Sequence, residues 1–281
     1  MPALAFKEAT LACAPAERIY ESSGTTAGPA HSARHHVPDV VLYRAAALAG
    51  FRRAVLPAGE RRPFLVAAPE RTSHPASSLG EMVSWLREEH DSGTTASFLA
   101  ARGLDCTGLA RALDDRDPAE PVALIAVTAA LLRLTDHARS TGRCWQLPPG
   151  SLVIDTGGCK GYATDVARAE ILARYEEVLG VPPEQVVNEY GMTEMCSQLY
   201  ARGHGPWQAP PWVRTVVCHP ETGRAQPLGR PGLLRHFDLA NLGSVLAVQT
   251  DDVGREVEGG IELLGRAVEA EARGCSLLLA G

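Results

Sequence analysis

The sequence lacks the features that are typical of secreted, membrane-spanning and nucleic-acid-binding proteins. Residues 1–16 contain no basic leader followed by an apolar core, so we expect no secretion signal. The longest apolar run, residues 122–132, is too short to span a bilayer as a helix. A formal net charge of −6 without a basic block makes nucleic acid a poor candidate partner.

Cysteine is too sparse and too scattered for its common structural uses. The seven cysteines are odd in number and have no C-x-x-C spacing. This pattern argues against a disulfide framework and against a zinc site. It suits a reducing compartment, and we therefore expect a cytoplasmic protein.

The hydrophobic pattern predicts an α/β fold. A chain of 281 residues that is 45% apolar can bury a sizeable core. Short apolar runs alternate with segments of helical periodicity, which predicts a largely parallel sheet with helices. The predicted strands are residues 64–68, 122–127, 152–154 and 186–188. The predicted helical or amphipathic segments are residues 6–18, 37–54, 79–90, 104–113, 128–139 and 166–179.

The composition changes after residue 202. Proline and glycine recur over residues 203–232, which predicts loops and short edge strands. Three β-type segments follow, at residues 233–237, 245–249 and 261–264. We expect an α/β core over residues 1–202, a small antiparallel β lobe over residues 203–265 and a tail over residues 266–281.

One stretch near the N-terminus combines hydroxyl side chains with glycines. Residues 20–29 read Y-E-S-S-G-T-T-A-G-P. Glycine allows tight turns, and successive backbone N–H groups with hydroxyls form a nest for anionic oxygens. The alternative is an ordinary polar surface loop. The candidate phosphate-binding residues are Ser22, Ser23, Gly24, Thr25, Thr26 and Gly28.

This stretch resembles the phosphate loop of adenylate-forming enzymes, the acyl- and aryl-CoA ligase superfamily. The superfamily has glycine where this chain has Ala27, and lysine where it has Ala30. Arg34 or His31 are candidates for the missing positive charge. His35 and His36 follow, and we expect a largely exposed loop pair of which at most one is functional.

A second stretch, residues 188–194, reads N-E-Y-G-M-T-E and resembles the Y-G-x-T-E motif of the same superfamily. The resemblance implies that Tyr190 and Gly191 lie near the nucleotide or the acyl group. It implies that Thr193 and Glu194 serve the ATP phosphates during catalysis, with Glu194 also binding magnesium, which prefers carboxylate and phosphate oxygens. The alternative is a strand that ends in a turn.

Two further stretches extend the candidate nucleotide site. Gly157 and Gly158 follow a predicted strand, so we place them on the same carboxyl edge of the sheet as Tyr190. Asp252 occupies the position of the superfamily's T-G-D motif, which implies contact with the ribose hydroxyls through a carboxylate. Arg266 resembles the residue that begins the superfamily's hinge. An Asp-rich turn is the alternative for residues 250–252.

Three more motifs narrow the resemblance. They read D-T-G-G-C-K-G over residues 155–161, F-D-L-A-N over residues 237–241 and R-G-C-S-L over residues 273–277. With the first loop, they resemble the acyl-protein synthetase family, which includes the synthetase subunit of the bacterial luminescence fatty acid reductase. The resemblance covers essentially the whole chain and implies the N-terminal-domain fold of adenylate-forming enzymes, completed at the nucleotide site by the β lobe.

The resemblance implies a reaction in two steps that uses ATP and Mg²⁺. A carboxylic acid reacts with ATP to give an acyl-adenylate and pyrophosphate. The acyl group then passes to Cys275, whose thiolate would be favoured by the neighbouring Arg273, and onward to a partner reductase. The alternative for Cys275 is a small apolar residue in a tail strand.

Two other functions stay open from the sequence. One is an acyl- or aryl-CoA ligase with free CoA as the acceptor; the other is a degenerate subunit that binds nucleotide without catalysis, as Ala27, Ala30 and the short segment before the loop suggest. We expect no C-terminal lid domain with its catalytic lysine, for which Lys160 is a speculative replacement. The 5% of aromatic residues do not decide between fatty and aryl acids.

Overall fold

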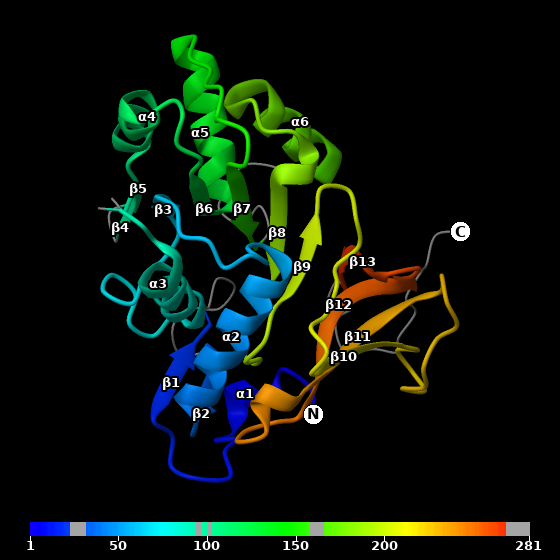
Figure 1. Ribbon diagram of the computed structural model, residues 1–281. Helices are drawn as coiled ribbons and strands as arrows, with labels where there is room; N and C mark the ends of the chain where they lie inside the picture. The colour runs from blue at the N-terminus through cyan, green and yellow to red at the C-terminus, as the bar shows by residue number, and fades with distance from the viewer. Residues whose placement is uncertain (23–31, 94–96, 101–102, 158–165, 268–281) are drawn as a thin grey trace.

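The computed structural model describes residues 1–22, 32–93, 97–100, 103–157 and 166–267 (Figure 1). The helices are α1 Ala5–Glu8, α2 Val40–Ala54, α3 Ser78–His90, α4 Cys106–Asp115, α5 Thr128–Thr141 and α6 Arg168–Leu179, with short 3-10 turns at η2 Pro183–Gln185 and η3 Leu239–Asn241. The strands are β1 Arg18–Glu21, β2 Arg34–Val37, β3 Phe64–Ala67, β4 Leu99–Ala100, β5 Gly103–Leu104, β6 Ala123–Val127, β7 Leu152–Thr156, β8 Val186–Tyr190, β9 Leu199–Arg202, β10 Val213–Cys218, β11 Pro231–Asp238, β12 Ala247–Val257 and β13 Gly260–Arg266.

The central element is a five-stranded sheet in the order β3-β6-β7-β8-β9. The first four strands pair in parallel and β9 pairs antiparallel to β8. The predicted α/β architecture with a mostly parallel sheet is therefore confirmed. Parallel strands end on one common edge, so the loops after β7 and β8 lie next to each other.

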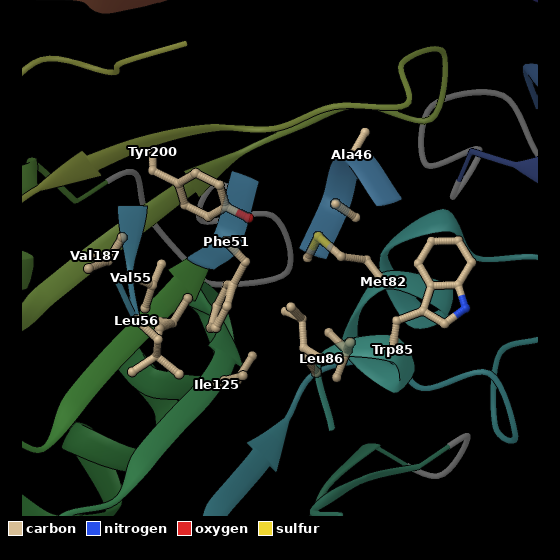
Figure 2. Close-up of a cluster of buried hydrophobic side chains, with 14 of the residues drawn as sticks. Ala46, Phe51, Val55, Leu56, Met82, Trp85, Leu86, Ile125, Val187 and Tyr200 are labelled. Carbon is tan, nitrogen blue, oxygen red and sulfur yellow. The ribbon is translucent and has the colours of Figure 1, made fainter. Parts of the chain in front are cut away.

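Helices cover both faces of this sheet. On one face, α2 and α3 bury a cluster that contains Phe51, Trp85, Ile125 and Val187 (Figure 2). On the other face, α4, α5 and α6 pack against the alternate residues of the same strands. Strands with both faces buried read as near-continuous apolar runs, which is why the sequence predicted them.

The helix ends follow local sequence signals. Asp39, Ser77 and Asp105 are the N-caps of α2, α3 and α4, and each side chain accepts a hydrogen bond from a backbone N–H in the first turn. Helices α5 and α6 end at Gly142 and Gly180, both in the left-handed conformation that glycine adopts without steric cost.

A second sheet of four antiparallel strands, β10 to β13, forms the β lobe beside the core (Figure 1). The predicted antiparallel lobe is confirmed, and β10 is one of the short edge strands predicted over residues 203–232. Strand β12 continues through residues 250–252, so the alternative of an Asp-rich turn there is wrong. The boundaries that divide residues 1–202, 203–265 and 266–281 stay a prediction. Among the described helices, none is long and apolar enough to cross a membrane.

The N-terminal segment differs from its prediction. Only Ala5–Glu8 is helical within the helix expected over residues 6–18. Pro15 has no N–H to continue a helix, and the backbone N–H of Ala3 is bonded to the carbonyl of Gln249 at 2.9 Å. The chain then enters β1, which pairs antiparallel with β2. His35 and His36 therefore lie in a strand rather than in the expected loop, and Val37 belongs to that strand rather than to the expected helix, which begins at Val40.

Candidate functional site

Two glycines flank the carboxyl edge of the sheet. Gly157 follows β7 and Gly191 follows β8, and the register that pairs Thr156 with Glu189 brings the two loops together. Gly157 has a φ of +72°, which other residues rarely adopt. A Cβ on Gly191 would lie 2.5 Å from Glu189 Oε1, so this position admits no larger residue without displacing that carboxyl group. The structure places both glycines where the sequence predicted them.

Tyr190 joins the core to the β lobe. Its hydroxyl donates to Asp252 Oδ2 at 2.7 Å, and Arg266 Nε lies 3.5 Å from Asp252 Oδ1. The structure thus brings together three predicted site residues from β8, β12 and β13. Asp252 is half-buried, which leaves part of its carboxylate accessible to a ligand.

His236 extends this network and was missed by the sequence analysis. Its Nε2 lies 3.3 Å from the Tyr190 hydroxyl, and its Nδ1 lies 2.9 Å from Thr215 Oγ1. Burial lowers the pKa of His236 to about 4, so the ring is neutral at pH 7. The sequence did contain a signal for it. Side chains alternate between the two faces of β11, which places His236 on the same inner face of the lobe as Leu234 and Asp238.

The turn that carries Thr193 and Glu194 is held by its backbone. His35 Nδ1 lies 2.7 Å from the Thr193 carbonyl, and His35 Nε2 lies 2.9 Å from Asn241 Oδ1. Asn241 Nδ2 donates to the Glu194 carbonyl at 2.9 Å and to the Val245 carbonyl at 3.0 Å. The expectation that His35 lies in an exposed loop is wrong: strand β2 buries it completely, while His36 is half-buried.

His35 faces hydrogen-bond acceptors on both ring nitrogens. The Thr193 carbonyl only accepts, and the two bonds of Asn241 Nδ2 orient Oδ1 toward the ring. An imidazolium donates to both acceptors, whereas a neutral ring donates to one. Burial is the largest influence and lowers the pKa of His35 below its usual value, while these two hydrogen bonds act in the opposite direction without reversing the shift.

The F-D-L-A-N stretch has a structural role in the same turn. Asp238 is buried and accepts hydrogen bonds from the Cys196 N–H at 2.9 Å and the Ser197 hydroxyl at 2.7 Å. Together with Asn241, it fixes residues 193–197 against the lobe. The F-D-L-A-N stretch therefore supports the backbone of the turn that carries Thr193 and Glu194.

Glu194 is a buried carboxyl group at the start of this turn. Burial raises its pKa, and the positive charges of Arg266 and Lys7 act in the opposite direction. Within the described ranges, no group of three or more His, Cys, Asp or Glu side chains could hold a metal ion. A single carboxylate fits Mg²⁺ that is otherwise bound by phosphate oxygens and water.

Two buried carboxyl groups occupy opposite faces of the same edge. Asp155 lies on the α5–α6 side, where Arg168 Nη1 is 2.7 Å from Oδ2 and Asn188 Nδ2 is 3.1 Å from Oδ1. Glu189 lies on the other side and accepts a hydrogen bond from the Thr156 hydroxyl. Neither carboxyl group was predicted from the sequence to have a role.

Glu189 has the more perturbed environment. Burial raises its pKa from 4.5 to about 7, the Thr156 hydrogen bond acts in the opposite direction, and Asp155 adds to the increase. A carboxyl group with a raised pKa keeps its proton in the folded protein while the unfolded chain ionises. The free energy of unfolding therefore falls as the pH rises from about 4.5 to about 7, by about 3 kcal/mol in total from this group.

We predict that Glu189→Gln removes this fall in stability. The amide keeps the shape and can still accept from Thr156, but it does not titrate. Urea unfolding at pH 5 and pH 8 should show a smaller loss of stability at pH 8 in the variant than in the wild type. Glu258→Gln, at an exposed position, is the matched control. An identical pH dependence in Glu189→Gln and the wild type would contradict the assignment.

Several predicted residues lie outside the described residues: Ser23, Gly24, Thr25, Thr26, Gly28, Gly158, Lys160 and Cys275. Ser22 is described. Its Oγ accepts from the Ala33 N–H at 2.9 Å, and its own N–H donates to the Ala33 carbonyl at 2.9 Å. The ladder of β1 and β2 thus continues up to the candidate phosphate loop.

The fold is shared with adenylate-forming enzymes. The ATP-bound MatB from Rhodopseudomonas palustris is 18% identical, with a TM-score of 0.60 over 88% of this chain and 47% of that chain. A 2-hydroxyisobutyryl-CoA ligase in complex with 2-HIB-AMP is 16% identical, with a TM-score of 0.62 over 90% and 52%. The o-succinylbenzoate CoA synthetase MenE from Bacillus subtilis is 17% identical, with a TM-score of 0.57 over 88% and 48%. This chain therefore has the fold of the N-terminal domain of adenylate-forming enzymes and spans about half the length of these solved structures.

A family model described as acyl-protein synthetase, LuxE, matches residues 15–281. The chain belongs to that family, as its motifs predicted. A search of curated proteins found no match.

Proposed function

We propose that the protein activates a carboxylic acid with ATP to form an acyl-adenylate. The observation that carries the proposal is the hydrogen bond between Tyr190 and Asp252, which closes the core onto the β lobe beside the Thr193–Glu194 turn. A half-buried carboxylate, an aromatic ring and a backbone-held turn next to one sheet edge suit a nucleotide. Family membership and the fold of the neighbours support the same chemistry.

In this proposal each group has a separate task. Asp252 accepts hydrogen bonds from the ribose hydroxyls with the lone pairs that Tyr190 and Arg266 leave unused. Gly157, Gly158 and Gly191 let the backbone approach the nucleotide closely.

The hydroxyls and N–H groups of residues 22–28 cradle the phosphates. Glu194 would hold Mg²⁺, which neutralises charge on the phosphate oxygens when bound. His35 and Asn241 keep the Thr193 and Glu194 backbone in place for these contacts.

For the second step, we propose that the acyl group passes from the adenylate to Cys275, with release of AMP, and then to a partner reductase. The assignment rests on family membership and on the R-G-C-S-L stretch. The two CoA ligases among the neighbours support a rival acceptor, free CoA. In either case the carbon–oxygen bond to AMP breaks as a carbon–sulfur bond forms.

Mass spectrometry after incubation with Mg-ATP and a panel of fatty and aromatic acids distinguishes these acceptors. We expect an ATP-dependent acyl adduct that maps to Cys275 and is absent from Cys275→Ser. Cys13→Ser is the matched control, because Cys13 is an exposed free cysteine in a different part of the chain. Pyrophosphate release without an adduct, and full turnover by Cys275→Ser with CoA, would instead establish CoA as the acceptor.

A further inference from the structure

The β lobe contains a pocket of about 300 Å³ that the proposed reaction does not use. Its lining includes Arg214 and Val216 from β10, Gly223 and Ala225 from the following loop, and Arg235 and Phe237 from β11. Side chains alternate along β11, so Arg235 and Phe237 point away from the face on which His236 contacts Tyr190. The pocket therefore opens on the opposite face of the lobe sheet from the candidate nucleotide site.

Arg235 is held in place by a neutral side chain. Its Nε donates to Gln249 Oε1 at 2.9 Å, and Gln249 Nε2 donates in turn to the Leu234 carbonyl at 3.0 Å. The guanidinium group is thus oriented, and within the described part of the chain no carboxylate forms an ion pair with it. Two other arginines of the lobe differ in this respect, because Arg255 pairs with Glu262 and Arg266 pairs with Asp252.

Arg214 adds a second positive charge to the same pocket. In the β10–β11 register, Arg214 lies opposite Phe237 and Val216 lies opposite Arg235, so the two arginines are diagonal neighbours on one face. Such neighbours are within reach of long side chains, and like charges there repel each other. Among the residues that the structure describes, neither arginine has a carboxylate partner within ion-pair distance. An anion would relieve this repulsion, and arginine binds carboxylate and phosphate groups through two parallel hydrogen bonds.

The rest of the lining is apolar and close to the guanidinium group. Val216, Ala225 and Phe237 supply this surface. Gly223 has a φ of +65°, and a Cβ there would lie 3.4 Å from Arg235 Nη2. Glycine thus permits the turn of the loop, which lies next to the guanidinium group of Arg235. We propose that this pocket binds a small molecule in which a phosphate or carboxylate group is attached to an apolar group.

The proposal is tested by calorimetric titration of the full chain with phenyl phosphate, benzoate and inorganic phosphate at low salt. We expect phenyl phosphate or benzoate to bind more tightly than inorganic phosphate, and the stronger of the two identifies the anionic group. The double variant Arg214→Gln, Arg235→Gln should weaken that binding at least tenfold. Arg255→Gln, on the same lobe, should leave it unchanged.

Two further variants separate this pocket from the candidate nucleotide site and from loss of folding. Asp252→Asn should not change the binding of phenyl phosphate or benzoate, whatever it does to ATP. Phe237→Leu should weaken the aromatic probes while leaving inorganic phosphate as it was. Equal binding of the probes by the double variant and the wild type, or loss of binding in Asp252→Asn, would overturn the assignment. The test does not depend on adenylation activity.

Discussion

Replacement of Asp252 by asparagine is expected to raise the KM for ATP and to lower kcat/KM by roughly 100-fold. A carboxylate accepts a hydrogen bond from each ribose hydroxyl, whereas the amide offers a single acceptor oxygen. Hydrogen bonds to charged groups contribute about 1.5–3 kcal/mol each, and about 1.4 kcal/mol corresponds to tenfold in rate. In the proposed reaction the ribose takes no part in bond making or breaking, so the loss should fall mainly on KM.

Two controls make the test of Asp252 specific. Asp251→Asn changes the exposed neighbour on the same strand and should stay close to the wild type. In addition, the wild type should prefer ATP over 2′-deoxy-ATP, and the Asp252 variant should lose most of that preference. An Asp252→Asn protein that still discriminates fully between the two nucleotides would contradict the ribose contact.

Replacement of Asp155 by alanine is expected to destabilise the fold by about 3 kcal/mol, the lower end of the typical cost of removing one partner from a buried ion pair, because the Arg168 side chain is 24% exposed. Asp155 is completely buried, and its carboxylate lies 2.7 Å from Arg168 and accepts a hydrogen bond from Asn188. Alanine would leave both of those polar groups without this acceptor beneath the glycine loop after β7. The free energy of unfolding in urea at pH 7 measures the loss.

Glu170→Ala provides the matched comparison on the same helix. Glu170 and Arg174 form an ion pair on the surface of α6, with 55% of the Glu170 side chain exposed. Such a pair contributes about 0.3–0.5 kcal/mol, so this variant should lose little stability. A comparably small loss for Asp155→Ala would show that the buried pair does not support the edge of the sheet.

The fold was largely predictable because its strands are short apolar runs between helical segments. The parallel order then required the loops at Gly157 and Gly191 to share an edge. The predicted N-terminal helix was too long because it rested on the alanine and glutamate content of the segment despite Pro15. That composition gave no sign of the bond between Ala3 and Gln249. Strand β2 was missed because its partner β1 lies on the other side of the candidate phosphate loop in the sequence. No short hairpin turn therefore marks the pair.

The candidate site was predictable only where a motif carried it. Tyr190 and Asp252 were both named, but the hydrogen bond between them joins residues 62 positions apart and has no local signal. His35 was assigned to a loop, since the two acceptors that face it come from residues 158 and 206 positions away. In the sequence, Asp155 and Glu189 look like ordinary residues near the ends of strands. Only the strand register shows that they lie on opposite faces of one edge of the sheet.

Exchange of labelled pyrophosphate into ATP, in the presence of Mg²⁺ and a panel of fatty and aromatic acids, tests whether the protein forms an acyl-adenylate. We expect exchange that depends on at least one of these acids and is reduced strongly in Asp252→Asn. Exchange should be retained in Cys275→Ser, because it reports the first step alone. Binding of Mg-ATP without exchange for any acid would contradict the account and favour a subunit that binds nucleotide without catalysis.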